Sequence, residues 1–285
     1  MSVIIGLPTL RENLKIMINI SIVVLCKDNP DELKNTLMSI ENQIKPCMLE
    51  VLIGDGSSDS KCLNAVSTVF KENKKLSWRH IPDEGPKGIY YAMNNCIENA
   101  TYETIAFMNS GDVYIRNDSL VLLHKTYIKA NKDRNINAVF GRVMIRSQDF
   151  KINWFVPGAG VENISLWLKF FEPNHQGMLF STEWAKKNLF DTKSPIGADA
   201  TFKKKSLSNA DETSFCAVPV AEFTLGGVSS KPADFTLLTV KLAEPSRSIA
   251  ARFFELVKFF LYKLIPIRYE IIMKYKSIIV SKFFC

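Results

Sequence analysis

Residues 20–112 alternate short apolar runs with segments of helical periodicity, and this alternation constrains the fold more than any other feature of the chain. The runs 20–25, 49–53, 76–81 and 105–108 are rich in β-branched or other apolar residues and predict buried strands. The segments between them predict helices. Alternating strands and helices are typical of an α/β fold with a mostly parallel, Rossmann-like sheet covered by helices on both faces.

Two of these predicted strands end in an acid. Asp55 follows the run 49–53, and Asp112 follows the run 105–108 within a polar turn. Asp also favours turns and helix N-caps for purely structural reasons. In open α/β sheets, however, ligands bind outside the carboxyl ends of the strands. A pair of acids there fits a nucleotide diphosphate, with Asp55 facing the nucleoside and Asp112 holding Mg²⁺ or Mn²⁺.

Other classes of site lack their signatures. The chain has neither a Walker A motif nor Gly-x-Gly-x-x-Gly. Its six cysteines show no metal-ligand spacing, so we expect reduced, packed thiols and a reducing compartment. The net charge of +7 is concentrated in the tail, which argues against a nucleic-acid partner. The first residues do not have the order of a secretory signal, so the N-x-S/T matches at Asn99, Asn117 and Asn163 are expected to be coincidental.

Motifs in order along the chain resemble the GT-A glycosyltransferases of family 2, and the similarity covers roughly residues 20–230. The similar segments are ISIVVLCKDNPDELKNTLMSIENQ, LEVLIGDGSSD, GIYYAMN, FMNSGD and HQ. The nearest resemblance is to bacterial enzymes that build O-antigen (the polysaccharide of lipopolysaccharide), capsule or exopolysaccharide. It implies a hexosyltransferase that moves a sugar from a nucleotide-sugar to a glycan or lipid-linked acceptor, with inversion and a divalent cation.

The resemblance also implies roles for individual residues. Donor contacts fall on Cys26, Asp28, Asp55, Lys87, Gly88, Asn94, Asn109 and Ser110. Asp112 is the implied metal ligand. Asp199 is the implied general base, although a helix N-cap is the structural alternative. His175 begins the acceptor half and is either catalytic or structural.

Some positions depart from the family pattern. Pro86 and Tyr91 stand where acids are usual, and Gly54 precedes Asp55 in place of an acid. Two alternatives therefore remain open at this point. One is a sugar-phosphate nucleotidyltransferase, although the expected glycine-rich basic loop is absent at residues 26–29. The other is a membrane-associated nucleotide-sugar-binding protein without catalysis.

The C-terminal tail carries +6 of the net charge between residues 247 and 285. A helix is predicted up to Pro266, and its apolar residues cluster on one side: Phe253, Phe254, Val257, Phe260, Leu261 and Leu264. Residues 269–284 resume a similar pattern. Charges interrupt the tail too often for a spanning helix. Basic amphipathic helices suit an anionic bilayer surface, with packing on the domain or on a second copy as the alternative.

The predicted organisation has three parts. Residues 1–19 form an extension with a short helix near 11–17, and residues 20–232 form the GT-A domain. Within it, 20–115 is the nucleotide-binding half and 116–232 the acceptor half. Residues 233–285 form the membrane-associating tail. We expect a cytoplasmic protein held peripherally on the inner face of the cell membrane.

Overall fold

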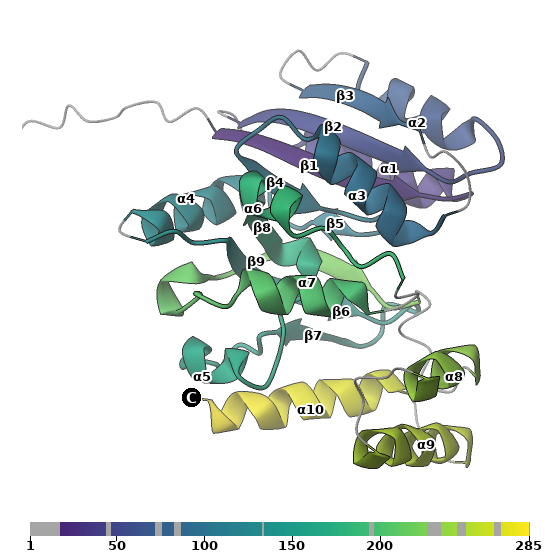
Figure 1. Cartoon of the computed structure of the whole chain (residues 1–285), viewed down its shortest axis with the longest axis vertical. Coiled ribbons are helices and arrows are strands. Elements are labelled where there is room, and N and C mark those ends of the chain that lie inside the picture. The colour runs from purple at the N-terminus through teal and green to yellow at the C-terminus, as the bar shows by residue number, and fades with distance from the viewer. Residues whose placement is uncertain are drawn as a thin grey trace, which may run out of the picture.

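The computed structural model contains one nine-stranded sheet with helices on both faces (Figure 1). It describes residues 18–43, 47–71, 76–82, 87–132, 134–193, 197–226, 235–243, 249–264 and 269–284. The strand order is β3-β2-β1-β4-β8-β6-β9-β5, and β7 pairs with β6. The first strand begins at Ile18, inside the predicted extension, and the helix expected near 11–17 lies outside the described residues.

The N-terminal half follows the predicted alternation closely. Its elements are β1 (Ile18–Cys26), α1 (Pro30–Glu41), β2 (Cys47–Asp55), α2 (Lys61–Val69), β3 (Leu76–Ile81), α3 (Ile89–Asn99) and β4 (Thr104–Phe107). All pairs among these four strands are parallel. Their carboxyl ends therefore lie at one edge of the sheet, where the predicted acids are found.

The second half is mixed. Its elements are β5 (Val113–Tyr114), α4 (Ser119–Asn131), β6 (Ala138–Arg146), β7 (Asn153–Val156), α5 (Ile164–Leu168), β8 (Met178–Ser181), α6 (Thr182–Lys187), α7 (Ala198–Ser206) and β9 (Phe215–Thr224). Short 3₁₀ turns span His175–Gly177 and Glu212–Ser214. β6 and β9 are parallel, whereas β8, β7 and β5 pair antiparallel with their neighbours. The α/β prediction is confirmed, with parallel pairing among the first four strands.

Side chains of β1 alternate between two apolar layers. Ile20, Ile22 and Val24 pack with α1, α2 and α4 on one face. Val23 and Leu25 pack with α3, α6 and α7 on the other. This alternation is the period of two expected for a strand. Both faces are covered, which explains why the strand sequences are apolar throughout.

Three helices follow the sheet: α8 (Phe235–Ala243), α9 (Ile249–Leu264) and α10 (Tyr269–Phe283). The last of them lies along β7 (Figure 1). Ser277 Oγ donates to the Phe155 carbonyl at 2.9 Å, and a Cβ on Gly158 would collide with Ser281. Close packing of this kind fixes the position of α10 on the domain. Among the described residues, no helix combines the length and the apolar character needed to cross a bilayer.

Candidate active site

The ends of β1 and β2 form one side of the site. Cys26 and Asp55 are register partners on these parallel strands. The loops that follow are joined, because the Asp28 carboxylate accepts from Ser58 N at 3.0 Å and Asp28 N donates to Ser57 Oγ at 2.8 Å. The structure thus brings together three of the predicted donor contacts, Cys26, Asp28 and Asp55.

Cys26, Asp55 and Cys62 place possible ligand atoms within 4.8 Å of one another. Burial, together with the neighbouring Asp55 carboxylate, raises the pKa of the Cys26 thiol far above its usual value. A thiol coordinates metal as the thiolate. Cys26 is therefore a neutral packed thiol at physiological pH, as the cysteine spacing predicted.

The start of α3 forms the next wall. Gly88 precedes the helix with φ of 99°, a conformation that disfavours residues with a Cβ. Lys87 Nζ donates to Tyr91 Oη at 3.1 Å. The Asn94 side chain both donates to and accepts from the main chain of Phe190 at 2.9 Å, and so fixes that segment beside α3. Its contact with the donor stays a prediction.

The turn after β4 holds Asn109, Ser110 and Asp112. Gly111 has φ of 95°, and its N–H donates to Thr36 Oγ1 of α1 at 2.9 Å. Ser110 N donates to the Leu25 carbonyl at 2.9 Å. The turn is therefore fixed by both β1 and α1, and it delivers Asp112 to the carboxyl edge of the sheet.

Asp112 is 4% exposed, and the described residues give its carboxylate few hydrogen bonds. Gln176 Nε2 donates to Asp112 Oδ2 at 2.9 Å, and the backbone N–H of Thr224 also contacts the carboxylate. Burial raises the pKa of Asp112 to about 7, outweighing these two donors. The nearby charge of Glu32 acts in the same direction. A buried carboxylate without a positively charged partner favours binding of a cation.

The oxygen donors around Asp112 fit a divalent cation. Among the described residues, Ser110 Oγ and Gln176 Oε1 are buried polar atoms without a hydrogen-bond partner. Glu32 adds a second carboxylate, and a Cβ on Gly111 would lie 3.6 Å from its Oε2. Mg²⁺ and Mn²⁺ prefer such carboxylate and neutral oxygen ligands. Asp112 therefore has several oxygen atoms nearby that could complete the coordination of a cation.

Asp199 lies in the first turn of α7, on the other side of the site. Tyr90 Oη donates to Asp199 Oδ1 at 3.2 Å, and Lys203 Nζ lies 3.4 Å from Asp199 Oδ2. Burial favours a higher pKa for Asp199, but Lys203, His175 and Tyr90 together hold it below the usual value. The carboxylate is thus ionised at neutral pH. The N-cap position itself belongs to Gly197, so Asp199 is not the N-cap.

His175 lies between Asp199 and Asn109 of the turn after β4. Its Nδ1 lies 3.9 Å from Asp199 Oδ2, and its Nε2 lies 3.4 Å from Asn109 Nδ2. Burial and the charge of Lys203 lower the pKa of His175 to about 4, so the ring is neutral at pH 7. An amide nitrogen facing Nε2 favours the tautomer with the ring proton on Nδ1, the nitrogen on the side of Asp199.

Sequence reasoning missed four residues of the site. Tyr90 lies within the GIYYAMN motif but had no predicted role; its hydroxyl also accepts from Gly197 N at 3.0 Å. Lys203 bridges Asp199 and Glu172, whose Oε2 is 3.8 Å from Nζ. The spacing of four residues between Asp199 and Lys203 on a helix was an available signal. Glu32 and Glu172 reach the site only through tertiary packing.

The family model for glycosyl transferase family 2 matches residues 21–191, more than half of the chain. The chain therefore belongs to this family and is a family 2 glycosyltransferase. That membership removes the nucleotidyltransferase alternative. No curated protein matches the chain in sequence.

Solved structures share the fold at low identity. The mannosyltransferase PcManGT from Pyrobaculum calidifontis, in complex with GDP-Man and Mn²⁺, has a TM-score of 0.55 and 17% identity, covering 86% of this chain and 64% of that one. S. aureus TarS has a TM-score of 0.53 and 17% identity, covering 85% and 43%. A TarS 1–349 complex with UDP-GlcNAc has a TM-score of 0.54 and 17% identity, covering 85% and 72%. This chain thus spans less than half the length of TarS. Its fold is that of GT-A enzymes.

Proposed function

We propose that this protein transfers a sugar from a nucleoside diphosphate sugar to a hydroxyl of a glycan or lipid-linked acceptor, in assembly of O-antigen, capsule or exopolysaccharide. The observation that carries the proposal is the position of the dipeptide His175–Gln176. Gln176 contacts Asp112, and His175 contacts Asp199 and Asn109. One short turn thereby links the acid suited to a cation with the acid suited to a proton.

The donor site in this proposal follows the carboxyl edge of the sheet. Cys26, Asp28 and Asp55 surround the nucleoside, while Lys87 and Gly88 at the start of α3 face the diphosphate. Asn109 and Ser110 lie beside the sugar. Asp112, with Ser110 and Glu32 nearby, holds Mn²⁺ or Mg²⁺; the bound Mn²⁺ in PcManGT supports this choice. A divalent cation there supplies positive charge that stabilises the leaving diphosphate.

Asp199 acts as general base in this proposal. Its carboxylate takes the proton of the acceptor hydroxyl as that oxygen attacks the anomeric carbon and the bond to the diphosphate breaks, with inversion. Lys203 keeps Asp199 ionised, and Tyr90 fixes the orientation of the carboxylate. Neutral His175 lies 3.9 Å from the other oxygen, on the side of Asn109. The step depends mainly on this positioning.

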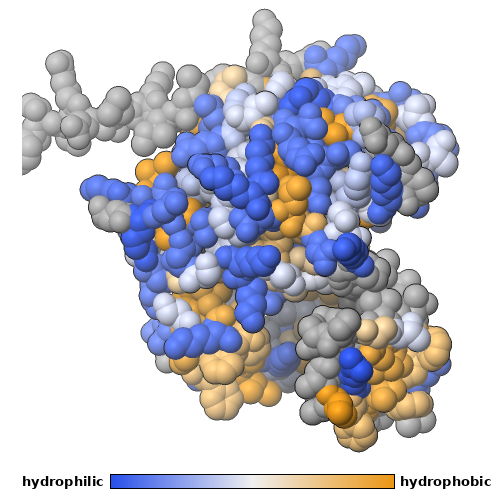
Figure 2. Space-filling model, in the orientation of Figure 1, coloured by the Kyte–Doolittle hydropathy of each residue, from blue (hydrophilic) through white to orange (hydrophobic). Residues whose placement is uncertain are grey.

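The C-terminal helices support a peripheral position on the inner face of the cell membrane. Figure 2 shows apolar side chains gathered over α8 and α9, including Phe235, Ile249, Phe253 and Phe260, which are 56–86% exposed. On α10 the exposed apolar residues recur at helical spacing: Ile271, Ile272, Tyr275, Ile278, Ile279 and Phe283. Apolar faces with flanking lysines suit an anionic bilayer surface. We expect Phe253→Ser with Phe260→Ser to reduce sedimentation with phosphatidylglycerol vesicles.

The transferase proposal is tested with a panel of UDP-, GDP- and TDP-sugars in Mn²⁺. Binding of each is measured by thermal shift, since a ligand stabilises the folded state according to its affinity. We expect sugars of one of the three nucleotides to raise the unfolding temperature, and we expect this increase to disappear when Mn²⁺ is removed. If none of the nucleotides binds, the donor site is wrong. Donor binding without any hydrolysis or transfer would favour the non-catalytic alternative.

A further inference from the structure

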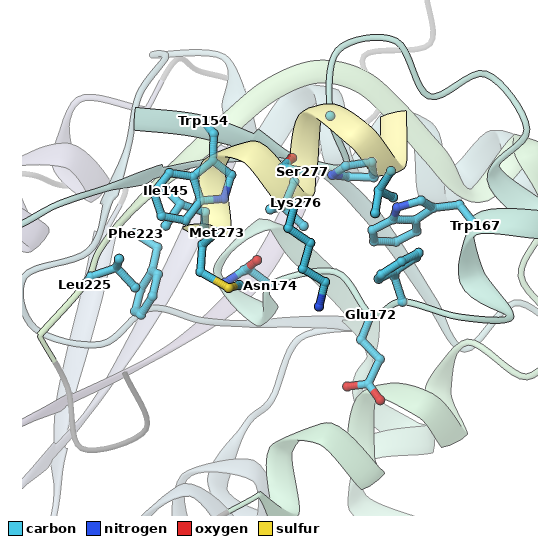
Figure 3. A pocket seen from close by; sticks show the side chains of 15 residues that line it. Ile145, Trp154, Trp167, Glu172, Asn174, Phe223, Leu225, Met273, Lys276 and Ser277 are labelled. Atoms are coloured by element: carbon cyan, nitrogen blue, oxygen red, sulfur yellow. The ribbon is translucent and has the colours of Figure 1, made fainter. Parts of the chain in front are cut away.

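A cavity of about 240 Å³ lies between α10 and the strands β6, β7 and β9 (Figure 3). Most of its lining is apolar and comes from elements far apart in the sequence: Trp154, Trp167, Phe171, Phe223, Met273 and Val280. Ligand pockets of proteins span roughly 300–1,000 Å³. The cavity therefore has room for a segment of a ligand that continues beyond it.

One end of this cavity adjoins the active site. Asn174, which lines it, directly precedes His175. Glu172, also in the lining, is ion-paired with Lys203 at 3.8 Å, and Lys203 lies 3.4 Å from Asp199. A molecule that occupies the cavity and extends past Asn174 reaches the proposed general base.

The same end carries a positive charge. Lys276 comes from α10, and its ammonium lies 5.8 Å from the centre of the Phe171 ring. In Figure 3 its side chain extends toward the side of the cavity that Asn174 and Glu172 form. Because Glu172 is paired with Lys203, Lys276 makes this end suitable for an anionic group.

α10 separates the cavity from a second apolar surface. Met273, Ser277 and Val280 face the cavity, whereas Tyr275, Ile279 and Phe283 are 54–77% exposed. The helix thus has one apolar side toward the catalytic domain and another toward the outside. A molecule from a lipid phase meets apolar side chains on both sides of α10.

We propose that this cavity binds the aliphatic chain of a phosphate-bearing lipid acceptor, with its phosphate at Lys276 and its acceptor hydroxyl at Asp199. The proposal rests on the transferase function and names the acceptor class for that site. A glycan is a poorer occupant, because its hydroxyls would lose water without finding partners on a mainly apolar lining, which costs free energy. An aliphatic chain has no such cost and gains from burial.

The test uses dodecyl phosphate below its micelle concentration as the probe, titrated calorimetrically into the full chain. We expect one site per chain. Val280→Trp fills the cavity and should weaken binding about tenfold or more. Ile279→Trp introduces the same side chain on the exposed side of α10 and should leave the affinity unchanged. Circular dichroism verifies that both variants fold.

Lys276→Met supplies an independent variant at an exposed position, so folding is not at risk. It should weaken dodecyl phosphate binding several-fold and leave dodecanol binding unchanged. Unchanged dodecyl phosphate binding in Val280→Trp would place the probe on the exposed apolar faces and overturn the proposal. A second result would also overturn the proposal. If maltohexaose binds and Val280→Trp abolishes that binding, while dodecyl phosphate does not bind, the cavity takes a glycan.

The transferase proposal is measured separately in the same samples by Mn²⁺-dependent binding of a nucleoside diphosphate. Val280→Trp and Lys276→Met should leave this binding unchanged. Nucleotide binding without dodecyl phosphate binding rejects the lipid site alone. Specific dodecyl phosphate binding without nucleotide binding rejects the donor site while the cavity assignment stands.

Discussion

Two buried carboxylates lie at different places on the same sheet, and their surroundings differ. Glu50 in β2 accepts hydrogen bonds from Ser21 Oγ, from the N–H and hydroxyl of Thr101, and from Arg79 at 3.2 Å. Asp112, after β4, accepts from Gln176 and from the Thr224 N–H. Both side chains are about equally buried, at 5% and 4% exposed.

The difference separates a structural acid from a functional one. Glu50 has donors for both oxygens, including a guanidinium, so its charge is compensated within the fold. The donors that the described part of the chain gives Asp112 are neutral, a second carboxylate lies nearby, and burial raises its pKa. Such an uncompensated acid costs stability and is retained where a site requires it. The comparison predicts opposite consequences for the two acids.

Asp112→Asn should reduce transfer by about 10³-fold or more, because the charge that binds the cation is lost. The same variant should be more stable than wild type in the absence of metal at pH 8. Raising a carboxyl pKa from 3.8 to about 7 loses stability as pH rises between those values, by roughly a few kcal/mol. Thermal unfolding in EDTA measures this gain. A destabilised Asp112→Asn would contradict the comparison.

Asp199→Asn should lower kcat by about 10²-fold or more while leaving the nucleotide affinity unchanged. The amide keeps the shape of the side chain but cannot take a proton. Steady-state kinetics and nucleotide titration separate the two quantities. Retained turnover would remove Asp199 as the base.

Glu50→Gln should act on stability and spare activity. An amide nitrogen in place of one oxygen opposes the donors of Thr101 or Arg79, and we expect a loss of about 2–3 kcal/mol. Urea unfolding measures the loss, and kcat of the folded protein should stay within about twofold of wild type. A large fall in kcat would show that Glu50 is linked to the site.

Lys203→Met should have the smallest effect. Removing the ammonium raises the pKa of Asp199 and of His175, since Lys203 lowers both. The acidic limb of the kcat profile should move to higher pH, with less than about a tenfold loss at pH 8. Lys205→Met, on the same helix and exposed, is the control. If the acidic limb of the kcat profile does not move in Lys203→Met, Lys203 does not set the charge state of Asp199.

The positions of Asp55 and Asp112 followed from the sequence, because parallel strands end at one edge and each acid follows an apolar run. Cys26 and Asp28, by contrast, were implied by the family resemblance. The contact between Tyr90 and Asp199 did not follow from the sequence, since 109 positions separate the two residues and no local pattern joins them. The same is true of Glu32, which reaches Asp112 through the packing of α1 against the turn.

The second half of the fold was less accessible to prediction. No strand or helix was predicted for the stretch that contains β7 and α5. β7 pairs with β6, and Phe284 at the end of α10 accepts hydrogen bonds from the chain that leads into α5. α10 was predicted as a helix with one apolar side, whereas the structure gives it a second contact surface on the domain. Tertiary contacts, which helical periodicity does not report, create that surface and the cavity behind it.

The most direct test is calorimetric titration of Mn²⁺ in the presence of a nucleoside diphosphate at pH 7, in two buffers of different ionisation enthalpy. With a pKa of about 7, Asp112 should release about half a proton per Mn²⁺ bound, because metal binding requires the deprotonated carboxylate. Glu50→Gln should behave as wild type, and Asp112→Asn should lose both the Mn²⁺ affinity and the proton release. Equal Mn²⁺ affinity in Asp112→Asn and wild type would contradict the account.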